Sequence, residues 1–185
     1  MHDRIAYVLL WPWWQRLFHW LLASGVLIAL LTHHGGNVHE VAGYAVAIIA
    51  GVRLILGLLG PPALRFTAFV RGWRSTVAYA FTVWHGTEPR HLNHNPLGAW
   101  MVVALLLLAL SGALVGWLYT TDRFWGMAWV INLHALLTWP FVGLIALHIA
   151  GVIHASVRHR ENLVAAMLHG YKRIEKTNRE GDRSR

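Results

Sequence analysis

Cysteine is absent from the 185 residues of this chain. Its absence excludes disulfide bonds, thiolate metal sites, iron–sulfur clusters and covalently attached c-type haem. Charged residues are also scarce, at 13% of the chain against about a quarter in soluble globular domains. Hydrophobic residues make up 56%, and the mean hydropathy is +0.45. These values predict an integral membrane protein.

Acidic residues are the scarcer of the two charged classes: eight Asp and Glu stand against 16 Lys and Arg, which gives a net charge of +8. In a soluble protein this balance would suggest nucleic-acid binding, but here the basic residues lie between and after the apolar runs. We therefore expect contact with membrane lipid and no nucleic-acid partner. The N-terminal segment lacks a small-x-small cleavage site, so we expect the first apolar run to remain in the mature protein.

Four apolar runs cover about residues 13–31, 39–59, 97–119 and 129–157. Each has the roughly 20 residues that a helix needs to cross a bilayer, and a backbone in lipid must satisfy its own hydrogen bonds. The predicted fold is therefore all-α, an integral membrane four-helix bundle. We place residues 1–174 in one four-span domain and expect residues 175–185 to form a basic, disordered tail.

Lys and Arg are distributed unevenly between the connections. Segment 60–96 carries four Arg and the region after residue 157 carries eight Lys and Arg, whereas 32–38 has none and 120–128 has one. The positive-inside rule then places both termini and the long loop in the cytoplasm. Apolar residues recur at helical spacing over 66–84, which predicts a helix lying in the cytoplasmic interface. A short surface helix is expected within 158–173.

The last apolar run contains three histidines, although ionisable residues inside a membrane are costly and are candidates for function. His134 and His148 are 14 residues apart, almost four full helical turns, so they point to nearly the same face about 21 Å apart along the axis. His154 is rotated by roughly 200° from His134. We expect it to lie off that face, near the cytoplasmic surface, without a ligand role.

Two further histidines lie at matching depths in other spans. His19 is on the cytoplasmic side of the first span and His39 opens the second span on the periplasmic side. The topology pairs His19 with His148 and His39 with His134, which predicts that each pair ligates the iron of one b-type haem. A bundle with hydrogen-bonded interfacial histidines is one alternative. A metal-ion transporter is another, but it would place Asp or Glu among the histidines.

Arg53 is the one Arg deep within a span. It follows His39 by 14 residues and so lies on the same face, at the level of the cytoplasmic haem. We expect it to bind a haem propionate, with snorkelling to the interface as the alternative.

His94 and Asn95 stand at the cytoplasmic start of the third span, directly before Pro96. They could bond a quinone carbonyl. For Asn95 the position before a proline also fits a helix cap, which is the better-supported alternative.

Several motifs resemble the bacterial cytochrome b561 family, which includes the cytochrome b subunits of nickel–iron hydrogenases. They are RLFHW (16–20), HEVAGY (39–44), VRLILGLLGP (52–61), LRFTAFV (64–70), HNPLGAW (94–100), TDRFWG (121–126), the His134 to His148 spacing and RENLVAAMLHGYKR (160–173). The resemblance implies a four-helix diheme cytochrome of the bacterial inner membrane that exchanges electrons with quinone. The ligand positions of the family fall on His19, His39, His134 and His148.

The resemblance implies two haem b cofactors, quinone as substrate, and electron transfer between the quinone pool and a periplasmic protein, such as a cytochrome c or an iron–sulfur subunit. Two other functions stay open. The chain could act alone as an oxidoreductase that couples superoxide oxidation to quinone reduction, or it could be a haem-bearing anchor subunit of a larger redox complex. The motifs leave open whether it is an enzyme in its own right.

Overall fold

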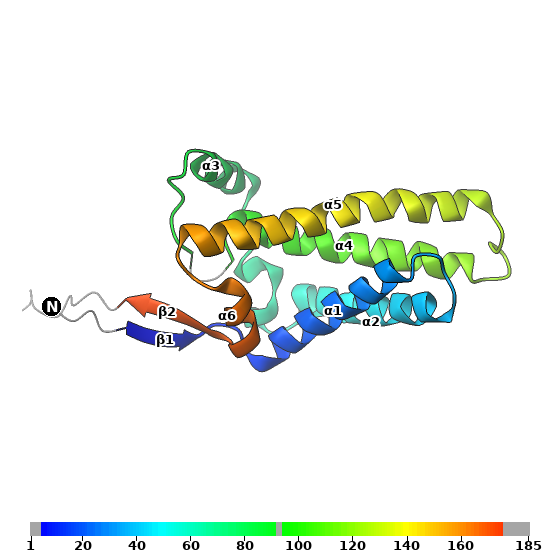
Figure 1. Ribbon diagram of the computed structural model, residues 1–185, viewed down its shortest axis with the longest axis horizontal. Coiled ribbons are helices and arrows are strands. Elements are labelled where there is room, and N and C mark those ends of the chain that lie inside the picture. The colour runs from blue at the N-terminus through cyan, green and yellow to red at the C-terminus, as the bar shows by residue number, and fades with distance from the viewer. Residues whose placement is uncertain (1–4, 92–93, 176–185) are drawn as a thin grey trace, which may run out of the picture.

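The structure is a computed structural model in which residues 5–91 and 94–175 are described. Its elements, in chain order, are β1 (Ile5–Leu9), α1 (Trp13–Leu31), α2 (Asn37–Leu59), the 3-10 turns η1 (Pro62–Leu64) and η2 (Phe66–Ala68), α3 (Trp73–Trp84), α4 (Pro96–Tyr119), α5 (Ala128–Arg158), α6 (Leu163–His169) and β2 (Tyr171–Glu175) (Figure 1).

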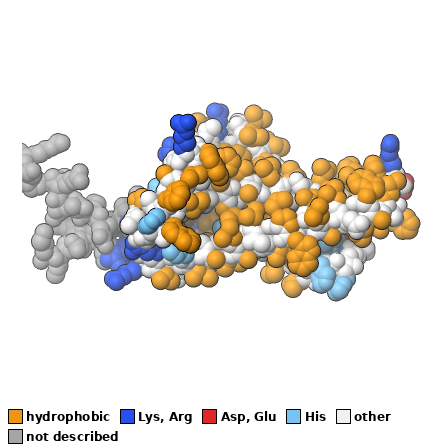
Figure 2. All heavy atoms as spheres, turned by 90° about the horizontal axis from the view of Figure 1, so that it is seen from above, with side chains coloured by type: hydrophobic (Ala, Val, Ile, Leu, Met, Phe, Trp, Pro, Cys, Tyr) orange, Lys and Arg blue, Asp and Glu red, His pale blue; other side chains and the backbone are white. Residues whose placement is uncertain are grey.

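The four long helices α1, α2, α4 and α5 are each long and apolar enough to cross a membrane. They match the four predicted spans, so the membrane-bundle prediction is confirmed. Hydrophobic side chains cover the visible face of the bundle, while Lys and Arg gather near its ends (Figure 2). Helix α5 has 31 residues, or about 46 Å at 1.5 Å per residue, so it is longer than a hydrocarbon core of about 30 Å. One or both of its ends must therefore project beyond the lipid tails.

The helices pack in the order α1–α2–α4–α5. A small core between α2 and α4 consists of Val46, Ala50, Leu106 and Ala109. Helix α5 packs its backbone closely on α4 but not on α1 or α2. The two helices that face α5 across the bundle are therefore separated from it by side chains rather than by direct helix–helix contact.

A two-stranded antiparallel sheet joins the two ends of the described chain. Strand β1 pairs with β2 in the register Leu9 opposite Tyr171, and the amides of Leu10 and Trp11 extend the contact by donating to the carbonyl of Gly170 at 2.9 and 3.1 Å. Gly170 has a φ of +91°, in the left-handed region, which lets the chain turn from α6 directly into β2. No pattern in the sequence predicted this sheet. Residues 176–185, most of the predicted disordered tail, lie outside the described residues.

The long loop contains a shorter helix than predicted. The expected helix over 66–84 begins only at Trp73, because η2 and the extended Gly72 precede it. Phe69 is turned inward and is 9% exposed, whereas Trp73, Phe81 and Trp84 are 62–87% exposed along the outer side of α3. This outer stripe has the character of a lipid-facing surface. The predicted tail helix is α6, capped by the Asn162 side chain, which accepts from the Ala165 amide at 2.8 Å.

Gly57 supplies a test of the packing between α2 and the loop. A Cβ added there would collide with the ring of Phe66, which already packs against Arg53 and Phe69. We predict that Gly57→Ala destabilises the protein by about 1–3 kcal/mol through overpacking. The matched control is Gly143→Ala, because that glycine is exposed on α5 with no atom within 4 Å of an added Cβ. Thermal unfolding in detergent measures the effect, and equal melting temperatures for the two variants would contradict this packing.

Candidate functional site

His39 on α2 and His134 on α5 face each other across the bundle, with ring centroids 6.0 Å apart and planes at 77°. Each ring is held by a backbone carbonyl of a neighbouring helix. Nδ1 of His39 lies 2.9 Å from the Ala29 carbonyl, and Nδ1 of His134 lies 3.0 Å from the Gly112 carbonyl. A carbonyl can only accept, so both Nδ1 atoms carry a proton and both Nε2 atoms keep a lone pair. This is the tautomer that binds a metal ion, and its orientation is fixed.

Helix α4 leaves room for the His134 ring. A Cβ added at Gly116 would lie 3.2 Å from Cε1 and 3.4 Å from Nδ1 of His134, tighter than ordinary contact. A glycine one turn after Gly112 therefore lets the ring reach the Gly112 carbonyl.

His19 on α1 and His148 on α5 are the second pair that the sequence predicts, and they lie near enough for the charge of His148 to act on His19. Both side chains are half-buried, and Nδ1 of His19 is buried without a hydrogen-bond partner among the described residues. A buried ring nitrogen without a partner is uncommon in native proteins, and Nδ1 of His19 differs from Nδ1 of His39 and His134 in having no carbonyl acceptor among the described residues.

These residues fit a haem. Each histidine pair spans α5 and a helix with which α5 makes no close backbone contact, so a flat ring can enter between them. Metal–imidazole bonds are about 2 Å long. Two such bonds to one ion would therefore span most of the 6.0 Å between the ring centroids of His39 and His134. In the part of the chain that the structure describes, no three His, Cys, Asp or Glu side chains cluster as a metal site. Two protein ligands, one from each side of the iron, is one arrangement that holds a haem.

Arg53 lies near the loop that follows α2. Its guanidinium donates to the Leu64 carbonyl at 3.3 Å and sits over the ring of Phe66 at 5.0 Å. Among the described residues no carboxylate lies within 4 Å of it. The positive charge therefore has a carbonyl and an aromatic face but no anionic partner from this part of the chain.

His94 lies in an aromatic pocket beside this arginine. Its ring stacks on Phe69 at 4.8 Å and meets the edge of Trp11 at 4.9 Å, and its Nδ1 is buried without a partner among the described residues. Burial, together with the nearby charges of Arg53 and Lys172, lowers the pKa of His94 to about 4. The ring is therefore neutral at physiological pH.

Asn95 has the capping role. Its Oδ1 accepts from the Gly98 amide at 2.7 Å at the start of α4. The structure thus supports the alternative that the sequence favoured for this residue, and of the two residues only His94 has a buried side-chain atom without a partner among the described residues.

The comparison with known families now bears on this geometry. A family model described as prokaryotic cytochrome b561 matches residues 10–170. The chain belongs to the prokaryotic cytochrome b561 family. It is accordingly a multi-pass membrane b-type cytochrome that binds haem b and takes part in electron transfer. No curated protein and no solved structure matches it.

One basic residue of this cytochrome escaped the sequence analysis. Lys172 on β2 is only 8% exposed, and its Nζ lies 3.5 Å from Oε2 of Glu161, which also pairs with Arg90. Burial lowers the pKa of Lys172, and its charge acts on His94. The sequence presented it as part of a surface helix. Only the strand pairing with β1 brings it inward, and no local pattern signals that pairing.

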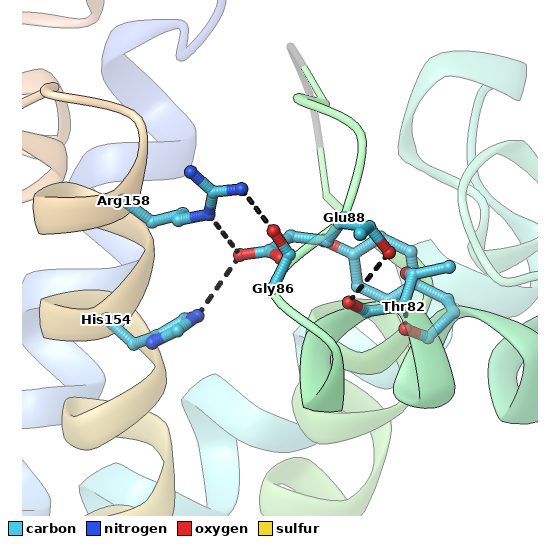
Figure 3. Close-up of polar contacts among 7 residues, drawn as sticks. Thr82, Gly86, Glu88, His154 and Arg158 are labelled. Carbon is cyan, nitrogen blue, oxygen red and sulfur yellow. Dashed lines mark hydrogen bonds and ion pairs between the residues drawn. The ribbon is translucent and has the colours of Figure 1, made fainter.

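A buried carboxylate also escaped the sequence analysis. Glu88, in the loop after α3, is 6% exposed, and its Oε1 lies 3.2 Å from both Nε2 of His154 and Nε of Arg158 (Figure 3). Arg158 also donates to the Gly86 carbonyl. A hydrogen bond from its own backbone amide, followed by His154 and Arg158, keeps the pKa of Glu88 below its ordinary value. His154 thus has a carboxylate partner in the long loop.

The capping role of Asn95 can be measured directly. We predict that Asn95→Ala lowers the free energy of unfolding by about 1 kcal/mol, because one amide at the start of α4 loses its acceptor. Asn95→Ser, which keeps a side-chain oxygen at the cap, should restore most of the loss. Equal melting temperatures for the alanine variant and the wild type would contradict the capping role.

Proposed function

We propose that this cytochrome holds two haems and conducts electrons between a periplasmic redox protein and membrane quinone. The observation that supports it most is the pair of carbonyl-anchored imidazoles, His39 and His134. In the proposal these two ligate one iron, and His19 and His148 ligate the other. A bound haem supplies one-electron chemistry at its iron.

The residues of the chain orient and insulate this chemistry. The carbonyls of Ala29 and Gly112 hold the Nδ1 protons of His39 and His134, which makes the opposite nitrogens better donors to iron. Arg53, which lacks a carboxylate partner among the described residues, is the group suited to a propionate of the second haem.

The spacing along α5 supports electron transfer across the membrane. His134 and His148 are 14 residues apart, about 21 Å along the helix. Because the β1–β2 end carries the basic tail and the long loop, the positive-inside rule assigns that end to the cytoplasm. We assign the His39 and His134 end to the periplasmic partner and the His19 and His148 end to quinone.

His94 is the residue that we assign to quinone. Its neutral ring has a buried nitrogen able to bond a quinone carbonyl, and Trp11 and Phe69 provide flat apolar contact. The charges of Arg53 and Lys172 would stabilise a headgroup that gains an electron. Asn95 contributes by fixing the start of α4 next to His94.

The ligand assignment is tested by two variants of α5. We predict that His148→Ala retains only one haem per chain, because it removes one of the two imidazoles that would hold the second haem. His154→Ala, six residues further along the same helix, should retain both haems, since that histidine faces Glu88 instead. Pyridine-haemochrome counts on the purified variants decide between them, and the reverse pattern would overturn the assignment.

The quinone assignment is tested in liposomes that contain the purified chain. An impermeant one-electron donor reduces the haems, and the oxidation of the haems is followed after a long-chain quinone is added. We predict that His94→Phe, which preserves stacking but removes the ring nitrogen, slows this oxidation by about tenfold, the equivalent of one hydrogen bond. Asn95→Ser serves as the control with unchanged rate. A His94→Phe rate equal to that of the wild type would contradict the assignment. Quinone reduction by superoxide with the chain alone would instead favour the autonomous oxidoreductase.

A further inference from the structure

The Glu88 cluster, made of Glu88, His154 and Arg158, lies apart from the four paired histidines. The two carboxylate oxygens of Glu88 differ in their hydrogen bonds. Oε1 of Glu88 receives both contacts from α5, whereas Oε2 is buried without a partner among the described residues. The side chain of Glu88 is 2% exposed, while that of His154 is 54% exposed. A solvent-accessible imidazole is therefore bonded directly to a carboxylate whose second oxygen is enclosed. Figure 3 shows His154 and Arg158 reaching from α5 toward this carboxylate.

Buried polar groups continue inward from Glu88. Tyr79 on α3 is 7% exposed, feels the charge of Glu88, and interacts with the side chain of Asn95. The ring of His91 meets Tyr79 edge-on at 5.2 Å, and its Nε2 is likewise buried without a partner among the described residues. Asn95 directly follows His94. Tyr79 thus lies within reach of the charge of Glu88 and touches the ring of His91, and it interacts with Asn95, the neighbour of His94 in the chain.

We propose that His154 and Glu88 are the entrance of a proton path that leads through Tyr79 and His91 to His94. The proposal rests on the assignment of quinone to the His94 pocket. Reduction of a quinone to a quinol consumes two electrons, which arrive one at a time from the periplasmic donor through the haems, and two protons. A headgroup enclosed by Trp11 and Phe69 needs side chains to deliver those protons.

Each proton follows the same route. His154 takes a proton from water and passes the proton on Nε2 to Oε1 of Glu88. The protonated carboxyl group then rotates, which carries the proton from the His154 side to the enclosed side, and releases it toward Tyr79 and His91, where unpartnered polar atoms are positions for ordered water. The proton reaches the His94 ring and bonds to a quinone oxygen, while Glu88 returns to the carboxylate. Arg158 cannot lose its proton, so it positions Glu88 and favours the charged form between transfers.

A clamp that only ties the long loop to α5 is the competing explanation. A clamp would engage both oxygens of the carboxylate and would not require a titratable partner at the solvent side. Here Arg158 alone suffices for the tie, because it contacts both Glu88 and the Gly86 carbonyl. The groups around Glu88 are Arg158 and His154 from α5, Tyr79 from α3 and His91 from its own loop, and three of these four can exchange a proton.

The liposome assay separates the two explanations with Glu88→Gln and Arg158→Gln. We expect Glu88→Gln to bind two haems and to be reduced by the donor at the wild-type rate in quinone-free protein. Its oxidation by quinone should be slower by about 100-fold, the lower range for loss of a proton-transfer group. Small weak acids such as formate or hydrazoic acid should restore part of the rate. Arg158→Gln, which weakens the tie but keeps the carboxylate, should slow the oxidation less than Glu88→Gln does, and weak acids should not raise its rate.

A second variant, Tyr79→Phe, tests the same path if Glu88→Gln does not fold. Tyr79→Phe keeps the buried ring and removes only the hydroxyl, and it should also slow quinone oxidation of the haems with rescue by weak acids. The path is overturned if Glu88→Gln and Tyr79→Phe turn over at the wild-type rate. It is also overturned if Glu88→Gln and Arg158→Gln are slowed equally and weak acids restore neither. Failure of quinone to oxidise the haems of the wild-type chain would instead overturn the proposed function itself.

Discussion

The hydrogen bonds from His39 and His134 to backbone carbonyls of neighbouring helices are the interactions on which the rest of this cytochrome depends. The Ala29 carbonyl lies in the last turn of α1, where carbonyls lack an amide partner from their own helix, and His39 supplies a donor to it. The Gly112 carbonyl lies inside α4 and has a second lone pair that can accept the imidazole proton of His134. The bond offsets the cost of placing a polar ring among apolar side chains. It also leaves the other nitrogen of each ring as a metal ligand in a fixed direction.

Helix α5 brings together groups that act at different depths. His134 faces α2 near one end, His148 faces α1 farther along, and His154 and Arg158 meet Glu88 of the long loop. Among the four spanning helices, α5 packs most closely on α4, and it presents His134 and His148 toward α2 and α1. One unusually long helix thus links the proposed electron route inside the membrane with the proposed proton route at its surface.

The sequence was sufficient for the features that follow the length of an apolar run, because runs of about 20 residues predicted the four spans. The orientation drawn from the charge bias, and the shared face of His134 and His148 drawn from the helical repeat, stay predictions. The β1–β2 sheet, the burial of Lys172 and the Glu88 cluster were not predictable, because each joins segments far apart in the chain through contacts without a local pattern. Asn95 was predictable only in part. Its position before Pro96 indicated a helix cap, and the 2.7 Å hydrogen bond that its side chain accepts from the Gly98 amide establishes that role.

The number of haems bound by the intact chain tests the central claim most directly. Histidine pairs at two depths, one of them oriented by backbone carbonyls, predict two haem b groups per chain. Each haem is expected to have two imidazole ligands and a low-spin spectrum. Pyridine-haemochrome quantitation of the purified wild-type protein, combined with electron paramagnetic resonance, measures both quantities. Two low-spin haems per chain is the predicted result, whereas one haem per chain, or none, would contradict the account.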